Sequence, residues 1–436
     1  MKFGEKLTLR VESFDERGRG VGTTEAKTTA ASFVIPGELV EGIFVGRKQG
    51  VAKMADVHVL ETSPDRVKTE CPHAGHCGGC AWQHVRYARQ AEEKRHMVAE
   101  ALSTVSVDVA EIVHAEEAFR HRNRMDFVFG PNGELGLKEP GRWDRHVDLS
   151  TCLLPSPEAT EVLNAVRAWA RTTSHKPWDN RRHEGFLRYV VIREGKFMNE
   201  RLVTLVTAQG ELEKKDALIA ALSPLCTSLV HGINPLMTDL SIATELRPLK
   251  GEALLREKIG AITYRIHPNA FFQTNSRMAA RLLERVRAIV LSGPHERLLD
   301  LYCGGGFFSL ALAKDVDSAL GVELEPQAIV EAEASAKENN IDNVRYRAEA
   351  AEKLSWETEK PDAVIVDPPR SGLHPKVKKT LLEKKPPRIV YVSCNYRTLA
   401  MDLKDLLTAY RAEPAVCVDL FPHTPHIETV VHLTLL

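Results

Sequence analysis

The chain has 436 residues, enough for two or three domains, each with its own hydrophobic core. Its 58 Lys and Arg residues balance 59 Asp and Glu residues, so any nucleic-acid surface must be a local one. No apolar run approaches the ~20 residues of a membrane span, and the start lacks the apolar core of a signal peptide. These features predict a cytoplasmic protein without membrane contacts, in which eight cysteines favour metal binding or catalysis over a disulfide framework.

Residues 1–65 are predicted to form a small, OB-like β-barrel. Short alternating segments such as KLTLRVESF, ASFVIPG and LVEGIFVGRK are separated by Gly-rich turns. Many barrels of this size bind single-stranded nucleic acid. The basic and acidic residues are balanced here too, so a packing role remains an alternative.

Residues 66–260 are predicted to form a central α+β domain. Segments such as RNRMDFVFG, GFLRYVVIREG and ERLVTLVTAQG alternate apolar and polar residues as half-buried antiparallel strands do. Helical stretches are expected near 86–104, 158–172 and 212–222. The domain begins with CPHAGHCGGCAWQH, which is dense in Cys, Gly and His.

Residues 261–436 predict an α/β domain of the Rossmann-like type. The apolar strands RLLDLYC, ALGVEL, DAVIVDPP and RIVYVSCN alternate with helices, which indicates a parallel sheet covered on both faces. The last two strands, AVCVDLFP and TVVHLTLL, are joined by a short connection. We expect them to form an antiparallel pair at the edge of the sheet.

The stretch DLYCGGGFFSLALA predicts a cofactor loop between a strand and a helix. Gly304, Gly305 and Gly306 let the backbone approach a ligand, and Glu323 at the end of the next strand can accept hydrogen bonds from both ribose hydroxyls of a nucleoside. NAD would also satisfy such a loop. However, Phe307 interrupts the G-x-G-x-x-G spacing, which favours S-adenosylmethionine.

Asp367 and Cys394 follow two of the predicted parallel strands, where ligands bind in open α/β sheets. A free cysteine is often a small buried side chain, as we expect for Cys226, Cys303 and Cys417. Cys394 differs because a helix begins directly after it, and the helix dipole is expected to lower the pKa of its thiol. Cys394 is therefore predicted to be a nucleophile.

The chemistry that these residues suggest is methylation of C5 of a pyrimidine. Thiolate addition to C6 makes C5 nucleophilic, and after methyl transfer a base must remove the C5 proton so that the thiolate can leave. Glu428, just before the final strand, is the candidate base.

Together these motifs resemble the RNA 5-methyluridine methyltransferase family, in particular its iron–sulfur-containing 23S rRNA-type members with an N-terminal TRAM barrel. The resemblance covers nearly the whole chain and includes CPHAGHCGGC, GFLRYVVIRE, FFQTN, DLYCGGGFFSLALA, DPPRSG, VSCNYRTLAMDL and HTPHIETV. It implies that Cys394 is the nucleophile and Glu428 the base. It also implies an S-adenosylmethionine pocket lined by Gln273, Tyr302, Glu323 and Asp367. Phe307 and Ala350 depart from the family pattern.

The cysteine-rich segment predicts a metal centre. Cys71, Cys77 and Cys80 have C-x5-C-x2-C spacing, and Cys152 is a candidate fourth ligand. Four thiolates suit either tetrahedral zinc or an iron–sulfur cluster, and the spacing does not separate the two. His73 or His76 could also serve as a zinc ligand. The family resemblance implies a [4Fe-4S] cluster.

A uridine within RNA must be flipped out to reach a buried thiolate. A group of arginines could contact the RNA backbone, and an ordinary solvated surface is an equally good interpretation of them. They are Arg120, Arg122, Arg124, Arg181 and Arg182. The resemblance favours a monomer that modifies 23S rRNA, with tRNA as the alternative substrate. Two other hypotheses are a methyltransferase of exocyclic amino groups, which needs no cysteine, and a non-catalytic RNA-binding iron–sulfur protein.

Overall fold

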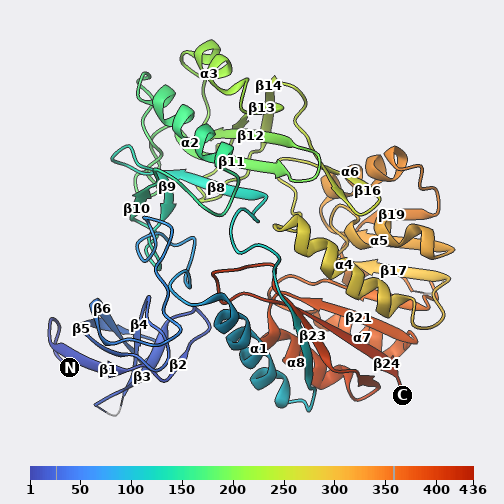
Figure 1. The fold of residues 1–436 in the computed structure, drawn as a ribbon. Helices are drawn as coiled ribbons and strands as arrows, with labels where there is room; N and C mark the ends of the chain where they lie inside the picture. Colours follow the sequence, from blue (N-terminus) through green and yellow to red (C-terminus); the bar gives the residue numbers. More distant parts are fainter. Residues whose placement is uncertain (26, 357–358) are drawn as a thin grey trace.

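The computed structural model describes residues 1–436 except 26, 357 and 358. Three main sheets follow one another along the chain. In Figure 1 the N-terminal sheet lies at the lower left, the helix-rich C-terminal part at the lower right, and the central sheet above them. No helix within the described residues combines the length and apolar composition of a transmembrane segment.

The N-terminal sheet has the strand order β1-β5-β6-β4-β3-β2. Val11 and Glu12 alone separate β1 from β2, although these strands stand at opposite ends of that order. The sheet must therefore curl until its edges meet, as the predicted small barrel requires. Its strands are β1 (Lys6–Arg10), β2 (Ser13–Phe14), β3 (Gly20–Thr24), β4 (Lys27–Ala31), β5 (Leu39–Lys48) and β6 (Val51–Glu61).

The central sheet has the order β10-β9-β8-β11-β12-β13-β14, and a separate hairpin, β15-β16, follows it. Its pairs are antiparallel except β12–β13. Helices α2 (Pro157–Ala170) and α3 (Lys215–Leu222) pack together beside it. The strands are β8 (Arg124–Phe129), β9 (Leu135–Lys138), β10 (His146–Asp148), β11 (Leu187–Gly195), β12 (Glu200–Thr207), β13 (Ser228–Ile233), β14 (Glu245–Lys250), β15 (Leu255–Ile259) and β16 (Ile262–Ile266).

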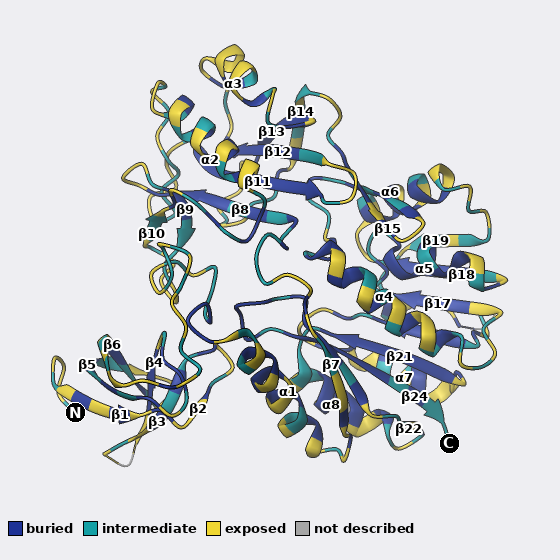
Figure 2. Cartoon of the chain, in the orientation of Figure 1, coloured by how far each residue is buried: buried dark blue, intermediate teal, exposed yellow. Residues whose placement is uncertain are grey.

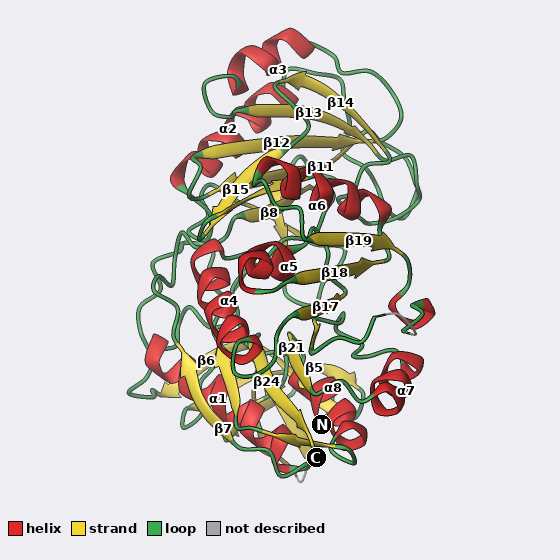
Figure 3. Ribbon diagram, turned by 90° about the vertical axis from the view of Figure 1, so that its right-hand side faces the viewer, coloured by secondary structure: helices red, strands yellow, loops and turns green. Residues whose placement is uncertain are grey.

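The C-terminal sheet has the order β19-β18-β17-β20-β21-β24-β23-β7, and β22 pairs with β24. Figure 3 shows the succession of β19, β18 and β17 and, below them, β21 and β24. The first five strands of the order are parallel, as predicted. The strands are β7 (Val109–Val113), β17 (Arg297–Leu301), β18 (Ser318–Glu323), β19 (Val344–Ala348), β20 (Ala363–Val366), β21 (Arg388–Ser393), β22 (Tyr410–Ala412), β23 (Ala415–Val418) and β24 (Glu428–Leu435).

Two features of this sheet differ from the sequence predictions. The pair β23–β24 is antiparallel as expected, but it is not at the edge, because β24 lies between β21 and β23 and β7 extends the sheet further. Strand β7 and helix α1 (Tyr87–Ser103) fall in the segment assigned to the central domain. They nevertheless belong with the C-terminal sheet, where α1 packs against β7 and α8.

Helices cover both faces of the C-terminal sheet, so its central strands are almost continuously buried (Figure 2). Helix α4 buries Met278, Leu282, Val286 and Val290 on one face, as its 3.6-residue period predicts. The helices of this region are α4 (Ser276–Val290), α5 (Phe307–Leu312), α6 (Pro326–Glu338), α7 (Pro375–Lys384) and α8 (Tyr396–Leu406), with short 3-10 turns η1 (Ala313–Asp315) and η2 (Ala351–Lys353).

Candidate active site

The candidate site lies at the carboxyl edge of the parallel strands. In register, Leu301 of β17 pairs with Val322 of β18 and with Val366 of β20, and Val366 pairs with Tyr391 of β21. The strands therefore end at one edge of the sheet. Tyr302, Glu323 and Asp367 directly follow these paired positions, and Cys394 directly follows β21, so the fold gathers four of the predicted site residues.

Cys394 and Glu428 lie at the same end of an antiparallel strand pair. Ser393, the last residue of β21, pairs with Thr429 in β24, so Cys394 and Glu428 each lie one residue beyond that pair. The charge of Glu428 raises the pKa of the Cys394 thiol, which indicates that the two groups are close together. The reversed direction of β24 thus brings its first residue to the edge where the parallel strands end.

Two carboxyl groups next to Cys394 have raised pKa values. Burial, and then the nearby Asp300 carboxylate, raise the pKa of Asp367 to about 7. Burial and the charge of Asp367 raise the pKa of Glu428 well above its usual value, while Arg370 opposes the shift. Glu428 is 4% exposed, and its Oε2 has no hydrogen-bond partner among the described residues. Perturbed, unpaired acids of this kind are typical of active sites.

The pKa of the Cys394 thiol differs from the sequence prediction. Burial, and then the charges of Glu428 and Asp367, raise it to about 11, so the helix dipole does not dominate. Arg370 acts in the opposite direction. The Arg370 carbonyl accepts hydrogen bonds from Asn395 Nδ2 (2.8 Å) and Thr398 Oγ1 (3.3 Å), which hold this arginine against the start of α8.

The glycine loop leaves room for a ligand. Gly304 N–H donates to Glu323 Oε2 (3.1 Å), and Gly306 adopts a left-handed backbone conformation (φ 78°). A Cβ atom built on Gly304 or Gly305 would meet no heavy atom of the described residues within 4 Å. This open strip beside Glu323 fits the adenosine part of S-adenosylmethionine.

Phe307 does not line that open strip. Its ring packs edge-on against Phe272 (5.8 Å between centroids), and its carbonyl accepts a hydrogen bond from Tyr264 Oη (2.8 Å). Phe307, which departs from the family pattern at this position, is therefore a packing residue. Ala350 is half-buried at the start of the η2 turn.

Gln273 is held from the central domain. It is 5% exposed, and its carbonyl accepts a hydrogen bond from Asn123 Nδ2 (2.8 Å). Two residues later Asn275 caps α4 and donates through Nδ2 to the carbonyl of Leu420 (3.2 Å), on the segment that leads to Glu428. The FFQTN motif therefore connects the central domain with the catalytic edge.

The four predicted metal-binding cysteines surround one cavity. Cys71, Cys77, Cys80 and Cys152 all line it, and most of the remaining lining is apolar. Gln83 Nε2 donates to Cys80 Sγ (3.2 Å). Among the described residues, no group of three or more His, Cys, Asp or Glu side chains is gathered closely enough to hold a single metal ion. The thiols thus stand around the cavity and do not converge on one point.

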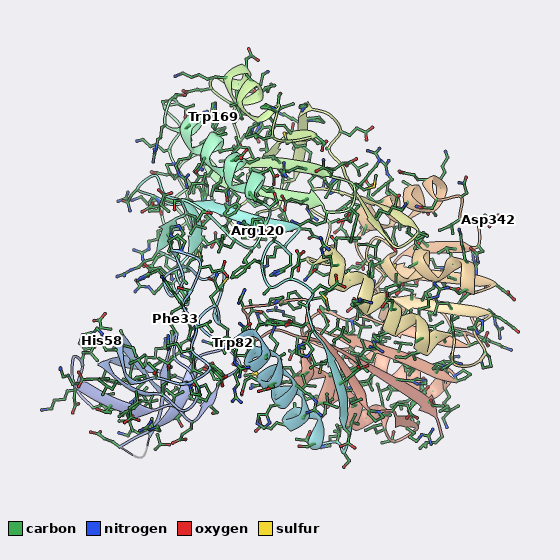
Figure 4. All side chains as sticks on the ribbon, in the orientation of Figure 1. Phe33, His58, Trp82, Arg120, Trp169 and Asp342 are labelled. Carbon is green, nitrogen blue, oxygen red and sulfur yellow. The ribbon has the colours of Figure 1, made fainter. Side chains whose placement is uncertain are left out.

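The predicted RNA-contact arginines have different surroundings. Arg120, labelled in Figure 4, donates to the carbonyl of Cys152 (3.1 Å), and Arg124 forms an ion pair with Asp126 (2.8 Å). Both therefore have structural partners. Arg182 is exposed, and Arg181, also exposed, lies over the ring of Trp143 (4.8 Å).

This parallel sheet, its glycine loop and the acidic residue at the end of β18 define a class I S-adenosylmethionine-dependent methyltransferase. A family model described as tRNA (Uracil-5-)-methyltransferase matches residues 252–361 and 355–435. The chain is 37% identical over 92% of its length to the tRNA (uracil(54)-C(5))-methyltransferase of Pyrococcus horikoshii, covering 94% of that protein. The chain therefore belongs to the RNA uracil-C5 methyltransferase family, which overturns the amino-group and non-catalytic hypotheses.

Two further comparisons extend over the whole chain. An RNA methyltransferase of Nanoarchaeum equitans is 36% identical over 98% of this chain and 92% of its own. The crystal structure of the Pyrococcus abyssi tRNA (uracil-54, C5)-methyltransferase in complex with S-adenosyl-L-homocysteine superposes with a TM-score of 0.83 at 32% identity, covering 98% of this chain and 99% of that chain. The protein thus methylates C5 of uracil in RNA with S-adenosylmethionine.

Two charged residues near this edge were not singled out in the sequence. Arg370 stood in the DPPRSG motif without an assigned role, and Asp300 was assigned none. Asp300 is fully buried, its pKa is raised to about 7 mainly by burial, and its Oδ2 accepts from Ser309 N–H (3.0 Å). The effects of Arg370 and Asp300 on the neighbouring acidic groups could not be predicted from local sequence, because they depend on which strands are neighbours.

Proposed function

We propose that Cys394 and Glu428 carry out the two covalent steps of uracil methylation. The observation that supports this most directly is that Cys394 and Glu428 each lie one residue beyond the last pair of β21 and β24, where the charge of Glu428 acts on the thiol. A nucleophile and a base in one pocket can act on adjacent carbons of a flat ring.

The proposed reaction begins with attack of the Cys394 thiolate on C6. The C5=C6 electron pair moves onto C5 and the C4 carbonyl oxygen as an enolate, and C5 then takes the methyl group while S-adenosylhomocysteine leaves. S-adenosylmethionine, held by Tyr302, Glu323, Asp367 and Gln273, supplies that methyl group from its sulfonium. Glu428 removes the C5 proton, the double bond re-forms, and the thiolate leaves C6.

The coupling of the acidic groups orders these steps. Burial and the charge of Asp367 raise the pKa of Glu428, and the charges of Glu428 and Asp367 raise the pKa of the Cys394 thiol. When the thiolate becomes a neutral thioether, the pocket loses one negative charge, which favours ionised Glu428 at the stage that needs a base. Once it holds the C5 proton it is neutral, which favours expulsion of the thiolate.

We further propose tRNA as the substrate, with uridine 54 as the target. The 23S rRNA preference rested on the barrel and the cysteine segment. A tRNA-modifying relative covers the same whole chain, so those parts do not indicate rRNA. The full-length match to two enzymes named for uracil 54 supports the tRNA alternative.

The cysteine cavity supports a [4Fe-4S] cluster bound by Cys71, Cys77, Cys80 and Cys152. Each ligand of such a cluster binds a different iron atom, so the thiolates stand around a cavity as they do here. Hydrogen bonds to sulfur, as from Gln83 to Cys80, are also common at such centres. Anaerobic purification with iron, sulfide and zinc assays tests this. We also propose that the protein is a monomer and that its N-terminal barrel, residues 1–65, is a TRAM domain. The proposed division at 260 holds for the central sheet, while α1 and β7 belong with the C-terminal sheet.

The substrate is tested with labelled S-adenosylmethionine and two unmodified transcripts, a tRNA and a 23S rRNA. Methylation of the tRNA, lost when its uridine 54 is replaced by cytidine, is the expected result. Labelling of the rRNA with none on the tRNA would contradict the proposal.

A further inference from the structure

The segment that delivers Glu428 to the active site is held by residues far from the reaction. We call residues 419–427, between β23 and β24, the strap. Asp419 and Leu420 are fully buried, and His423 is 5% exposed. His423 also has a left-handed backbone (φ 65°), a strained conformation that persists only when surrounding contacts hold it.

Helix α1 fixes the first part of the strap through two side chains. Lys94, fully buried, donates to Asp419 Oδ1 (2.6 Å) and to the carbonyl of Phe421 (2.9 Å). Tyr87 Oη donates to the other carboxylate oxygen of Asp419 (3.0 Å). A charged pair buried this deeply is retained only with such additional hydrogen bonds.

Gln90, one helical turn from Lys94, fixes the middle of the strap. Its Oε1 accepts from His423 N–H (2.8 Å), while its Nε2 donates to the carbonyls of Trp82 (3.0 Å) and Val85 (2.8 Å). Gln90 is fully buried. One side chain thus ties the strap to the segment that follows the cysteine motif.

The cysteine motif itself reaches the strap through the main chain. The N–H groups of Ala81 and Trp82, directly after Cys80, both donate to the carbonyl of His423 (2.8 and 2.9 Å). Figure 4 places Trp82 between the N-terminal sheet and α1. Two hydrogen bonds therefore connect the residues directly after Cys80 with His423, which lies five positions before Glu428.

We propose that Gln90 and Lys94 are positioning residues for the base Glu428, and that the cysteine motif reaches the base through Ala81, Trp82 and His423. This inference rests on the proposed function, because it assigns a supporting structure to the second covalent step. Loosening the strap displaces Glu428, whereas Cys394 is held by β21 and α8. Proton abstraction should thus suffer more than thiolate addition.

The test uses the full chain, an unmodified tRNA transcript and labelled S-adenosylmethionine. Two quantities are measured in one reaction: the protein–RNA complex that survives denaturation, and the released methylated RNA. In Gln90→Met, release should fall about tenfold to a hundredfold, as for a misplaced catalytic group, while covalent complex accumulates. The ratio of complex to product is independent of the folded fraction, since both come from folded enzyme.

Arg388→Met is the matched control for a buried polar side chain. Arg388 begins β21, the strand that Cys394 follows, so it lies at the end far from the site, and it donates to the carbonyls of Ile289 (3.2 Å) and Pro294 (3.1 Å). Arg388→Met should lower the melting temperature without changing the ratio of covalent complex to released product. Lys94→Met should behave like Gln90→Met.

The cysteine arm compares Cys80→Ser with Cys226→Ser, a buried cysteine that does not line the cavity. A ratio of covalent complex to released product that rises in Cys80→Ser but not in Cys226→Ser supports the connection between the cysteine motif and Glu428. If Glu428→Gln traps the complex but the ratio is unchanged in both Gln90→Met and Cys80→Ser, this inference is overturned and the proposed mechanism still holds. Absence of complex in Glu428→Gln itself contradicts the proposed function.

Discussion

The ionisation of Cys394 should respond in opposite directions to two neighbouring charges. Glu428 raises the pKa of the thiol and Arg370 lowers it. Glu428→Gln removes the negative charge and keeps the shape, so the pKa of Cys394 should fall. Arg370→Met removes the positive charge, so that pKa should rise above its value of about 11.

The magnitude follows from the charge that Glu428 carries at a pH where it is ionised. For two unit charges about 5 Å apart and an effective dielectric constant of ~20, the interaction is about 3 kcal/mol, or about two pKa units. Because only the thiolate reacts with alkylating agents, the alkylation rate below the pKa should rise about tenfold for each unit by which that pKa falls. The change in Glu428→Gln should therefore approach about a hundredfold.

The assay is iodoacetamide modification of the free protein across a range of pH, with mass spectrometry of the peptide that contains Cys394. Cys417 serves as an internal control, because it is fully buried in β23. The reasoning is refuted if Glu428→Gln and Arg370→Met shift the Cys394 profile in the same direction. It is also refuted if neither variant shifts the profile.

Three further predictions concern single residues of the site. Cys394→Ala should abolish methylation and leave the melting temperature nearly unchanged, because the thiol is half-buried; a calorimetric scan with a methylation assay checks both. Glu323→Gln should weaken S-adenosylmethionine binding about tenfold by titration calorimetry, since a charged acceptor becomes a neutral one. Gly306→Ala should destabilise the domain by about 1–2 kcal/mol from its left-handed backbone alone. The new Cβ would also overlap Tyr346 Oη, so chemical denaturation should show an even larger loss.

The sequence predicts the sheets well where the hydrophobic period is strong. The parallel strands ending at Leu301, Glu323, Val366 and Ser393 were all recognised from apolar runs followed by polar residues. The position of β7 in the C-terminal sheet was not predicted, because a strand of five residues carries no information about which strand it pairs with. Strand order depends on long-range packing that local patterns do not contain.

The candidate site shows the same division. The fold brings Cys394, Glu428 and Asp367 to one edge, as the motif positions suggested. The pKa of Cys394 differs from the prediction because the argument included the helix dipole and omitted the two carboxyl groups. Lys94 and Gln90 were overlooked because α1 reads as a polar, solvated helix, although both side chains are fully buried.

The central claim is that Cys394 adds to the target uracil and that the C5 proton must leave before the RNA is released. A tRNA transcript containing 5-fluorouridine tests it directly, because fluorine at C5 cannot be removed as a proton. With S-adenosylmethionine and the unaltered protein, we expect a one-to-one complex that survives denaturation and carries a methyl group. Its digestion should yield a crosslinked peptide attached through Cys394. Release of methylated RNA without a complex, or attachment through another residue, would contradict the account.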